Sequence, residues 1–242
     1  MCVMTIALAR IMALACLGGA WAQTLEVASV KPSRSSAADS NIDSVKGRLT
    51  ATNITVKELI RLAYGVRDYQ IGQAPGWVDS ERFDIVAKMV SGASHSLQDE
   101  KSLVRELLAE RFQLATHLEL KQMQVFSLVV AKGGPRLTAH NDAVPKIRGG
   151  CGRLVGRRVT ADGIATILSR QLDREVLNRA GIAGEYDVQL NFTPDSGPCQ
   201  ADVSGSPSIQ TALQEQLGLK LEAAKGPVGV LVIDRVERPS EN

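Results

Sequence analysis

The chain contains an internal repeat with a spacing of 105 residues. The stretch GRLTATNITVKELI begins at Gly47, and the similar stretch GRLVGRRVTADGIA begins at Gly152. The order of residue types is kept between the two stretches, and such self-similarity at a fixed period indicates a duplicated structural unit. The matched positions are Gly47-Arg48-Leu49 with Gly152-Arg153-Leu154, Ile54-Thr55 with Val159-Thr160, and Leu59 with Ile164.

Each copy of the repeat predicts a strand followed by a helix. Thr55 and Thr160 stand where the helix begins, and a threonine hydroxyl there accepts a hydrogen bond from a free backbone amide of the first turn. The apolar residues that follow recur at spacings of three and four, which predicts one buried stripe on each helix. They are Val56, Leu59, Ile60 and Ala63 in the first copy and Ile164, Ile167, Leu168 and Leu172 in the second.

More strands and a second helix follow in each copy. Residues 83–87 and 186–190 are rich in β-branched or aromatic residues and predict strands. Apolar spacing predicts second helices over 103–112 and 209–217. Each copy then ends with two strand-like segments, which we expect to form hairpins that turn at Lys121-Gln122 and at Lys225-Gly226-Pro227. The paired segments are 114–120 with 125–131 and 219–224 with 230–236.

The predicted fold class is therefore α+β. Two duplicated β-α-β-β-α-β-β modules are expected, each a small mixed sheet covered by two helices. The first module spans residues 23–131 and includes an extra strand at 25–31; the second spans 151–242. Residues 132–150 are rich in glycine, proline and polar residues and predict a linker. Because each module contains both helices and its own closing strands, we expect each to fold alone.

Residues 1–22 predict a signal peptide. Arg10 precedes an apolar run, and Ala20-Trp21-Ala22 fits the small-x-small rule, so we expect cleavage after Ala22. A transmembrane anchor needs about 18 unbroken apolar residues, and Arg10 and Gly18-Gly19 interrupt the run. No later stretch is long and apolar enough to span a membrane. We therefore expect an exported protein, periplasmic or extracellular.

The charge of the chain disfavours nucleic acid as a partner. After cleavage the chain has 27 Lys and Arg side chains and 26 Asp and Glu side chains, a net charge of +1. Basic and acidic residues alternate, as in VKELIRLAYGVRD, whereas binding to phosphate backbones needs a concentrated basic face.

Several blocks of sequence together carry a resemblance to a known family. They include LEVASVKPS, LTATNITVKELIRLAYGV, PGWVDSERFDIVAK, LLAERFQL and GIAGEYDVQLNFTPD. The chain resembles, over Leu25 to Asn242, the soil-associated family of secreted bacterial proteins of unknown function. The resemblance implies no established activity and no catalytic residues. Similar domains occur attached to membrane-bound sensor peptidases of the antibiotic-response type, which implies an extracytoplasmic sensing or binding role. The pattern of each half also resembles the short N-terminal modules of secretins and TonB-dependent receptors, which bind other proteins.

The chain lacks the common sequence signatures of exported hydrolases. HExxH, GxSxG, SxxK and a glycine-rich phosphate loop followed by lysine are all absent. The three histidines stand far apart in the sequence and none has a second histidine near it, so no metal or cofactor is expected; they are His95, His117 and His140. One enzymatic alternative stays open, a hydrolase with a carboxylate pair, because glycosidases hold two carboxyl groups about 5–10 Å apart. Its candidates are Asp79, Glu81 and Asp84, which the simpler interpretation makes a solvated charged turn.

One irregular segment of the first module is rich in aromatic and arginine residues. Between residues 64 and 82 it contains two of the three tyrosines and the one tryptophan outside the signal peptide, in a chain with only 4% aromatics. Recognition surfaces use such side chains for large contact area with a polar group attached. The sequence thus predicts a non-catalytic binding site for an envelope protein or peptide. Its candidates are Tyr64, Arg67, Tyr69, Trp77 and Arg82, with the alternative that Trp77 closes the core of its module.

The two cysteines that remain after cleavage generate the first testable prediction. Cys151 and Cys199 form an even pair in an oxidising compartment, and we expect them to form a disulfide. A disulfide that closes the loop between Cys151 and Cys199 should stabilise the fold by roughly 3–4 kcal/mol in the chain-entropy model. Mass spectrometry of protein recovered from the periplasm should find the pair two hydrogens lighter than the reduced form. Free thiols in that material would contradict the pairing.

Overall fold

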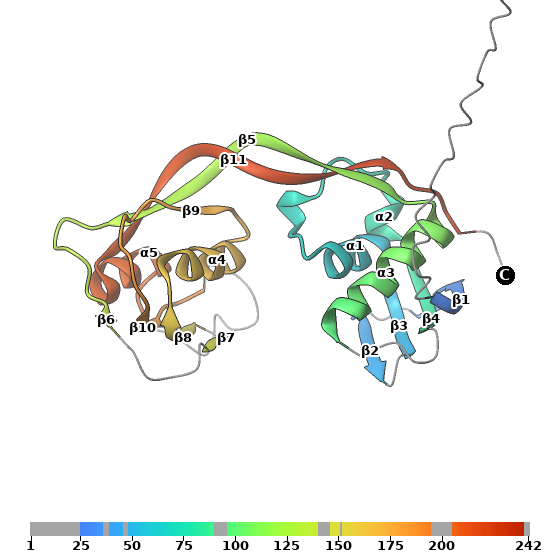
Figure 1. The fold of residues 1–242 in the computed structure, drawn as a ribbon, viewed down its shortest axis with the longest axis horizontal. Coiled ribbons are helices and arrows are strands. Elements are labelled where there is room, and N and C mark those ends of the chain that lie inside the picture. The colour runs from blue at the N-terminus through green and yellow to red at the C-terminus, as the bar shows by residue number, and fades with distance from the viewer. Residues whose placement is uncertain are drawn as a thin grey trace, which may run out of the picture.

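The computed structural model describes residues 25–35, 39–45, 48–89, 96–139, 146–150, 152–194 and 205–239. Within them the chain is a mixed α+β fold of two lobes joined by a long two-stranded ribbon (Figure 1). The signal peptide, Cys151, Cys199, His95 and His140 lie outside the described residues. The cleavage and the disulfide therefore stay predictions.

The first lobe is built on a four-stranded antiparallel sheet in the order β1-β4-β3-β2. Two helices, α1 and α3, pack with this sheet in one core, in which Phe83 and Phe112 meet edge to face with ring centroids 5.4 Å apart. Two short elements, η1 and α2, lie between α1 and β4. The bounds are β1 Leu25–Pro32, β2 Asn41–Val45, β3 Arg48–Thr55, α1 Val56–Tyr64, η1 Asp68–Gln70, α2 Trp77–Ser80, β4 Arg82–Met89 and α3 Leu97–Phe112.

The second lobe repeats this plan on a four-stranded sheet in the order β6-β10-β8-β7. Helix α4 and a shorter helical segment, α5 with η3, pack against it. The segment 132–150, expected as a linker, contributes the edge strands β6 and β7. The bounds are β6 Thr138–Ala139, β7 Lys146–Gly150, β8 Arg153–Val159, α4 Ala161–Leu172, β9 Val176–Asn178, β10 Tyr186–Asn191, α5 Ile209–Ala212 and η3 Leu213–Leu217.

The caps predicted for the two repeat helices are confirmed. The Thr55 hydroxyl accepts from the Glu58 amide while the Glu58 carboxylate accepts from the Thr55 amide, a reciprocal capping box. The Thr160 hydroxyl accepts from the Gly163 amide. The predicted apolar stripes are buried on both helices, except that Leu172 is half-buried.

The two lobes also share a strand irregularity at equivalent positions of the repeat. Asn53 and Arg158, which are 105 residues apart, both have positive φ, of 57° and 53°. In each case an aspartate of the neighbouring strand accepts the displaced backbone amide, Asp84 at 2.9 Å and Asp187 at 3.3 Å. An L-residue in this left-handed conformation is uncommon, so its occurrence at both positions fits the interpretation of a duplicated unit.

The closing strands do not form the predicted hairpins. Strand β5, Ala115–Val130, pairs antiparallel with β11, Leu219–Arg235, along their whole lengths. The predicted turns at residues 121–122 and 225–227 are continuous strand, and Gln122 lies opposite Pro227, its equivalent in the repeat. The hairpin prediction is wrong because the apolar pattern is the same in both possible partners. Each strand can pair with its neighbour in the same copy or with the equivalent strand of the other copy, and the structure shows the second pairing. Lys121-Gln122 also lacks the glycine or asparagine that a tight hairpin turn favours.

The ribbon exchanges core residues between the halves of the sequence. Leu231, near the end of the chain, is 2% exposed and belongs to the core of the first lobe. Leu128, from the first half, is fully buried in the core of the second lobe, and β9 pairs parallel with β5 beside it. Neither half of the sequence contains all of its own core, while independent folding of the halves stays a prediction.

Replacement of Leu231 by alanine should destabilise the first lobe, although it lies more than 100 residues from the rest of that core. We expect a loss of about 2–5 kcal/mol, as for other buried leucines. In a chain beginning at Gln23, Trp77 is the only tryptophan and packs against this core, so its fluorescence reports the transition in urea.

The matched control is Leu118→Ala, because Leu118 is the pairing partner of Leu231 on β5 and is 73% exposed. It should change the midpoint little. An unchanged Trp77 transition in Leu231→Ala would show that β11 does not complete the first core.

Candidate functional site

A cleft of about 640 Å³ is lined by both lobes, by residues of α1 and η1 on one side and of α4 on the other. Its volume falls in the range of small-molecule binding sites. Both lobes contribute to its walls, and most of the side chains that line it are polar. The lining residues are Ser40, Ile42, Glu58, Arg61, Leu62, Gly65, Val66, Arg67, Tyr69, Gln70, Thr166, Ser169, Arg170 and Glu175.

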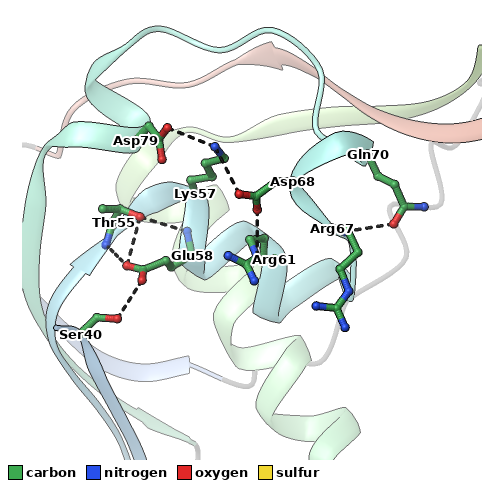
Figure 2. Close-up of polar contacts among 9 residues, drawn as sticks. All are labelled: Ser40, Thr55, Lys57, Glu58, Arg61, Arg67, Asp68, Gln70 and Asp79. Carbon is green, nitrogen blue, oxygen red and sulfur yellow. Dashed lines mark hydrogen bonds and ion pairs between the residues drawn. The ribbon is translucent and has the colours of Figure 1, made fainter. Parts of the chain in front are cut away.

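The loop after α1 shapes the first wall of the cleft. Helix α1 ends at Gly65, which has a φ of 68° and donates its amide to the Arg61 carbonyl. The left-handed conformation there favours glycine and turns the chain out of the helix. Arg67 follows in an extended conformation, and its amide donates to the Gln70 side chain at 3.1 Å, which fixes the start of η1 (Figure 2).

The ribbon holds this loop in place. The Gly72 amide donates to the Leu231 carbonyl at 2.8 Å, and the Gln70 side-chain amide donates to the Gly229 carbonyl at 3.4 Å. A Cβ atom on Gly72 would lie 3.3 Å from the Leu231 carbonyl oxygen, which is tighter than usual contacts. The first wall therefore depends on a strand from the far end of the sequence.

The last turns of α4 form the second wall. Ser169 is buried; its hydroxyl donates to the Ala165 carbonyl and accepts from the Val176 amide, both at 2.9 Å. These bonds tie α4 to the start of β9 and position Glu175, the residue before that strand. Thr166 and Arg170 are exposed on the same helix and line the cleft.

One hydrogen bond crosses directly between the lobes. The Tyr69 hydroxyl donates to the Glu175 carboxylate at 3.1 Å. Partial burial raises the pKa of Tyr69, and the negative charge of Glu175 raises it further, whereas the positive charge of Arg67 opposes the shift. Tyr69 thus stays protonated and able to donate at any physiological pH.

Glu58, the other carboxylate of the cleft, is held by the helix cap. It accepts from the Thr55 amide and from the Ser40 hydroxyl, each at 2.8 Å (Figure 2). Burial opposes ionisation of Glu58, but these hydrogen bonds outweigh that effect and lower its pKa. Glu58 is therefore ionised at neutral pH and already engaged in structural contacts.

Behind the first wall lies a network of ion pairs. Lys57 lies 3.1 Å from Asp79 and 3.6 Å from Asp68, and the hydrogen bond to Asp79 raises the pKa of Lys57. Asp68 also pairs with Arg61 at 3.1 Å (Figure 2). The network links α1, η1 and α2, so it supports the loop that carries Arg67 and Tyr69.

Two arginines of the cleft do not take part in this network of ion pairs. Within the part of the chain that the structure describes, the guanidinium groups of Arg67 and Arg170 have no hydrogen-bond or ion-pair partner. Arg67 is half-buried and Arg170 exposed. Figure 2 shows the Arg67 side chain extending away from the ion-pair network.

Of the five residues predicted to bind a partner, Arg67 and Tyr69 line the cleft. Tyr64 instead packs against the first core beneath Arg105, whose guanidinium lies 5.2 Å from the ring centroid. Trp77 packs against the same core beneath Arg238, also at 5.2 Å. Arg82 donates to a backbone oxygen of the β3 bulge at 2.7 Å.

The carboxylates considered for a hydrolase each have a structural partner. Asp79 binds Lys57, Glu81 binds Arg238 at 2.7 Å, and Asp84 accepts from the Asn53 amide. His117 bonds to Asp234 at 2.9 Å across the exposed ribbon. Among the residues placed by the structure, no group of three or more His, Cys, Asp or Glu side chains could hold a metal ion. Nor does the same part of the chain include a helix long and apolar enough to cross a membrane.

The sequence did not indicate the second wall. Thr166, Ser169, Arg170 and Glu175 lie in the second copy, where the segment equivalent to the aromatic one, residues 171–185, has no aromatic residue. Their residue types and spacing match no binding motif. Only the exchanged ribbon brings them opposite Arg67, so no local signal could have identified them.

The fold and the cleft together define a two-lobed α+β protein with a polar cavity between the lobes. Residues 57–236 match the family model described as "Protein of unknown function (DUF3738)", and the chain belongs to that family. The match runs from α1 through β11 and so includes the cleft residues of both lobes, apart from those that precede α1. No curated protein and no solved structure matches the chain.

The hydrogen bond between Tyr69 and Glu175 should couple the two lobes energetically. In a double-mutant cycle with Tyr69→Phe and Glu175→Ala, we expect a coupling free energy of about 1 kcal/mol in urea unfolding, typical of a single hydrogen bond. The control cycle replaces Tyr69→Phe by Tyr186→Phe, which removes a hydroxyl bonded to Ala183 in the second lobe. That cycle should be additive. Additivity in the Tyr69 cycle would argue against contact between the lobes at this point.

Proposed function

We propose that the protein is a non-catalytic, extracytoplasmic binding protein that holds its ligand in the cleft between its lobes. The cleft itself carries the proposal: residues of both lobes line an open, polar cleft of ligand size. The charged groups of its walls that have partners serve to hold the walls in place. The remaining polar groups of the walls form a surface suited to binding a ligand.

Features of the sequence support the extracytoplasmic location. The N-terminal segment has the charge, apolar run and small-residue site of a signal peptide. The cysteine pair suits an oxidising compartment. The soil association and the attachment of similar domains to sensor peptidases are properties of the proteins that the chain resembles, and they agree with a sensing role.

Ligand sensing would follow naturally from a cleft between two lobes. A ligand that touches both walls binds only the arrangement in which the walls face each other, so it stabilises that arrangement over others. The cavity suits a short peptide or a sugar fragment of the cell envelope better than a folded protein, which could not enter it. We therefore retain a peptide of the cell envelope as the proposed ligand.

Filling the cleft should abolish binding. Thr166→Trp places a large side chain in the cavity from an exposed helical position. Equilibrium dialysis against soluble peptide and sugar fragments of digested peptidoglycan, followed by mass spectrometry, should find species retained by the native protein and lost with Thr166→Trp.

The matched control is Gln98→Trp, which adds the same side chain at an exposed position on α3 that is not part of the cleft. It should retain the same species as the native protein. If nothing is retained, or if Thr166→Trp retains everything that the native protein does, the cleft is not a binding site for these fragments.

A further inference from the structure

The charges that line the cleft do not cancel. Three arginines line it, Arg61, Arg67 and Arg170, against two glutamates, Glu58 and Glu175. Arg61 is paired with Asp68, Glu58 accepts three hydrogen bonds in the helix cap and from Ser40, and Glu175 accepts one from Tyr69. The positive charges left without a partner in the described chain are thus those of Arg67 and Arg170, one on each wall.

We propose that the cleft binds a polar molecule with a single oxyanion group, a carboxylate or a phosphate monoester, through Arg67 and Arg170. This inference rests on the proposed function and adds the chemical class of the ligand. A guanidinium is planar and presents paired N–H donors that match the two oxygens of a carboxylate or phosphate. Arg67 is half-buried and Arg170 exposed, and within the described residues no carboxylate pairs with either guanidinium, so both are suited to this contact.

The two glutamates set an upper limit on the negative charge of the ligand. Both line the cleft together with Arg67 and Arg170, and the hydrogen bonds of the helix cap lower the pKa of Glu58. A polyanion would bring further negative charge close to them, which costs free energy in a confined cavity. One anionic group on a neutral polar body avoids that cost.

The size of the cavity excludes an inorganic ion as the whole ligand. A cleft of about 640 Å³ leaves most of its volume empty around one phosphate or carboxylate. The remainder is lined mainly by polar groups, among them Thr166, Ser40 and Gln70, with Ile42, Leu62 and Val66 as its apolar part. The rest of the ligand should therefore be a neutral, hydrogen-bonding body such as a capped peptide or a sugar.

Titration calorimetry with two pairs of probes tests the inference. The first pair is N-acetyl-alanyl-alanine, which has one carboxylate, and its C-terminal amide. The second pair is glucose 6-phosphate and glucose. We expect the native protein to bind at least one anionic probe at millimolar concentration and neither neutral counterpart. The anionic probe that binds identifies the source of the oxyanion.

Substitutions then assign the contact. Arg67→Ala and Arg170→Ala should each weaken binding of the anionic probe by tenfold or more, and Arg67→Lys should restore part of the loss because it keeps the charge without the paired donors. Arg157→Ala, which removes an exposed arginine on β8, should bind as the native protein does. Thermal melts of all four variants should match the native melt, because none of these side chains is buried.

Two results would overturn the inference. One is equal binding of an anionic probe and its neutral counterpart, or no binding of either anionic probe. The other is unchanged binding of the anionic probe by both Arg67→Ala and Arg170→Ala. If the Thr166→Trp variant still loses its ligands in either case, the cleft remains a binding site and only the anionic class is wrong. If Thr166→Trp loses nothing, the proposed function itself fails.

Discussion

The pairing of β5 with β11 is the interaction on which the rest of the structure depends. It joins the ends of the two halves of the sequence along 16 rungs, from Leu219 opposite Val130 to Arg235 opposite Ala115. Through it, each lobe receives part of its core from the other half of the chain. The same ribbon holds the loop of Gly72 by a backbone hydrogen bond. The pairing of β5 with β11 thus both completes the cores of the two lobes and positions the loop that lines the cleft.

The ribbon also explains why a polar cleft can exist between lobes that are stable without it. Each lobe buries its own apolar side chains beneath its sheet, with Leu231 and Leu128 supplied across the ribbon. The surfaces that face each other need not contribute apolar contact to hold the lobes together. They carry arginine, glutamate and hydroxyl groups instead, most of which have partners within their own lobe. Within the described residues, Arg67 and Arg170 have no such partner, which leaves their guanidinium groups available to a ligand.

Local features of the fold could be predicted because they depend on neighbours in the sequence. A threonine followed three residues later by glutamate, with apolar residues at helical spacing behind it, specifies the start and the buried face of α1 within a few residues. Thr160 and the apolar spacing behind it specify the start and the buried face of α4 in the same way, with Gly163 in place of the glutamate. Two residues of the candidate site, Arg67 and Tyr69, were within reach for a similar reason: they stand in an irregular segment whose composition differs from that of its repeat.

What the sequence by itself determined is a set of units: the repeat helices with their caps, the inner strands, the spacing of 105 and the aromatic segment of the first copy. The strands β2, β6, β7 and β9 were not among them. Only the tertiary structure decided how the closing strands pair. Residues 114–131 and 219–236 have nearly equivalent patterns of apolar residues. A hairpin within each copy and a ribbon between the copies would therefore pair the same kinds of side chain, and local sequence does not favour one over the other. The choice is made by what lies at the ends of the ribbon, where Leu231 and Leu128 enter two different cores. That choice also places Arg170 opposite Arg67, a juxtaposition that depends on residues 103 positions apart and that no local pattern contains.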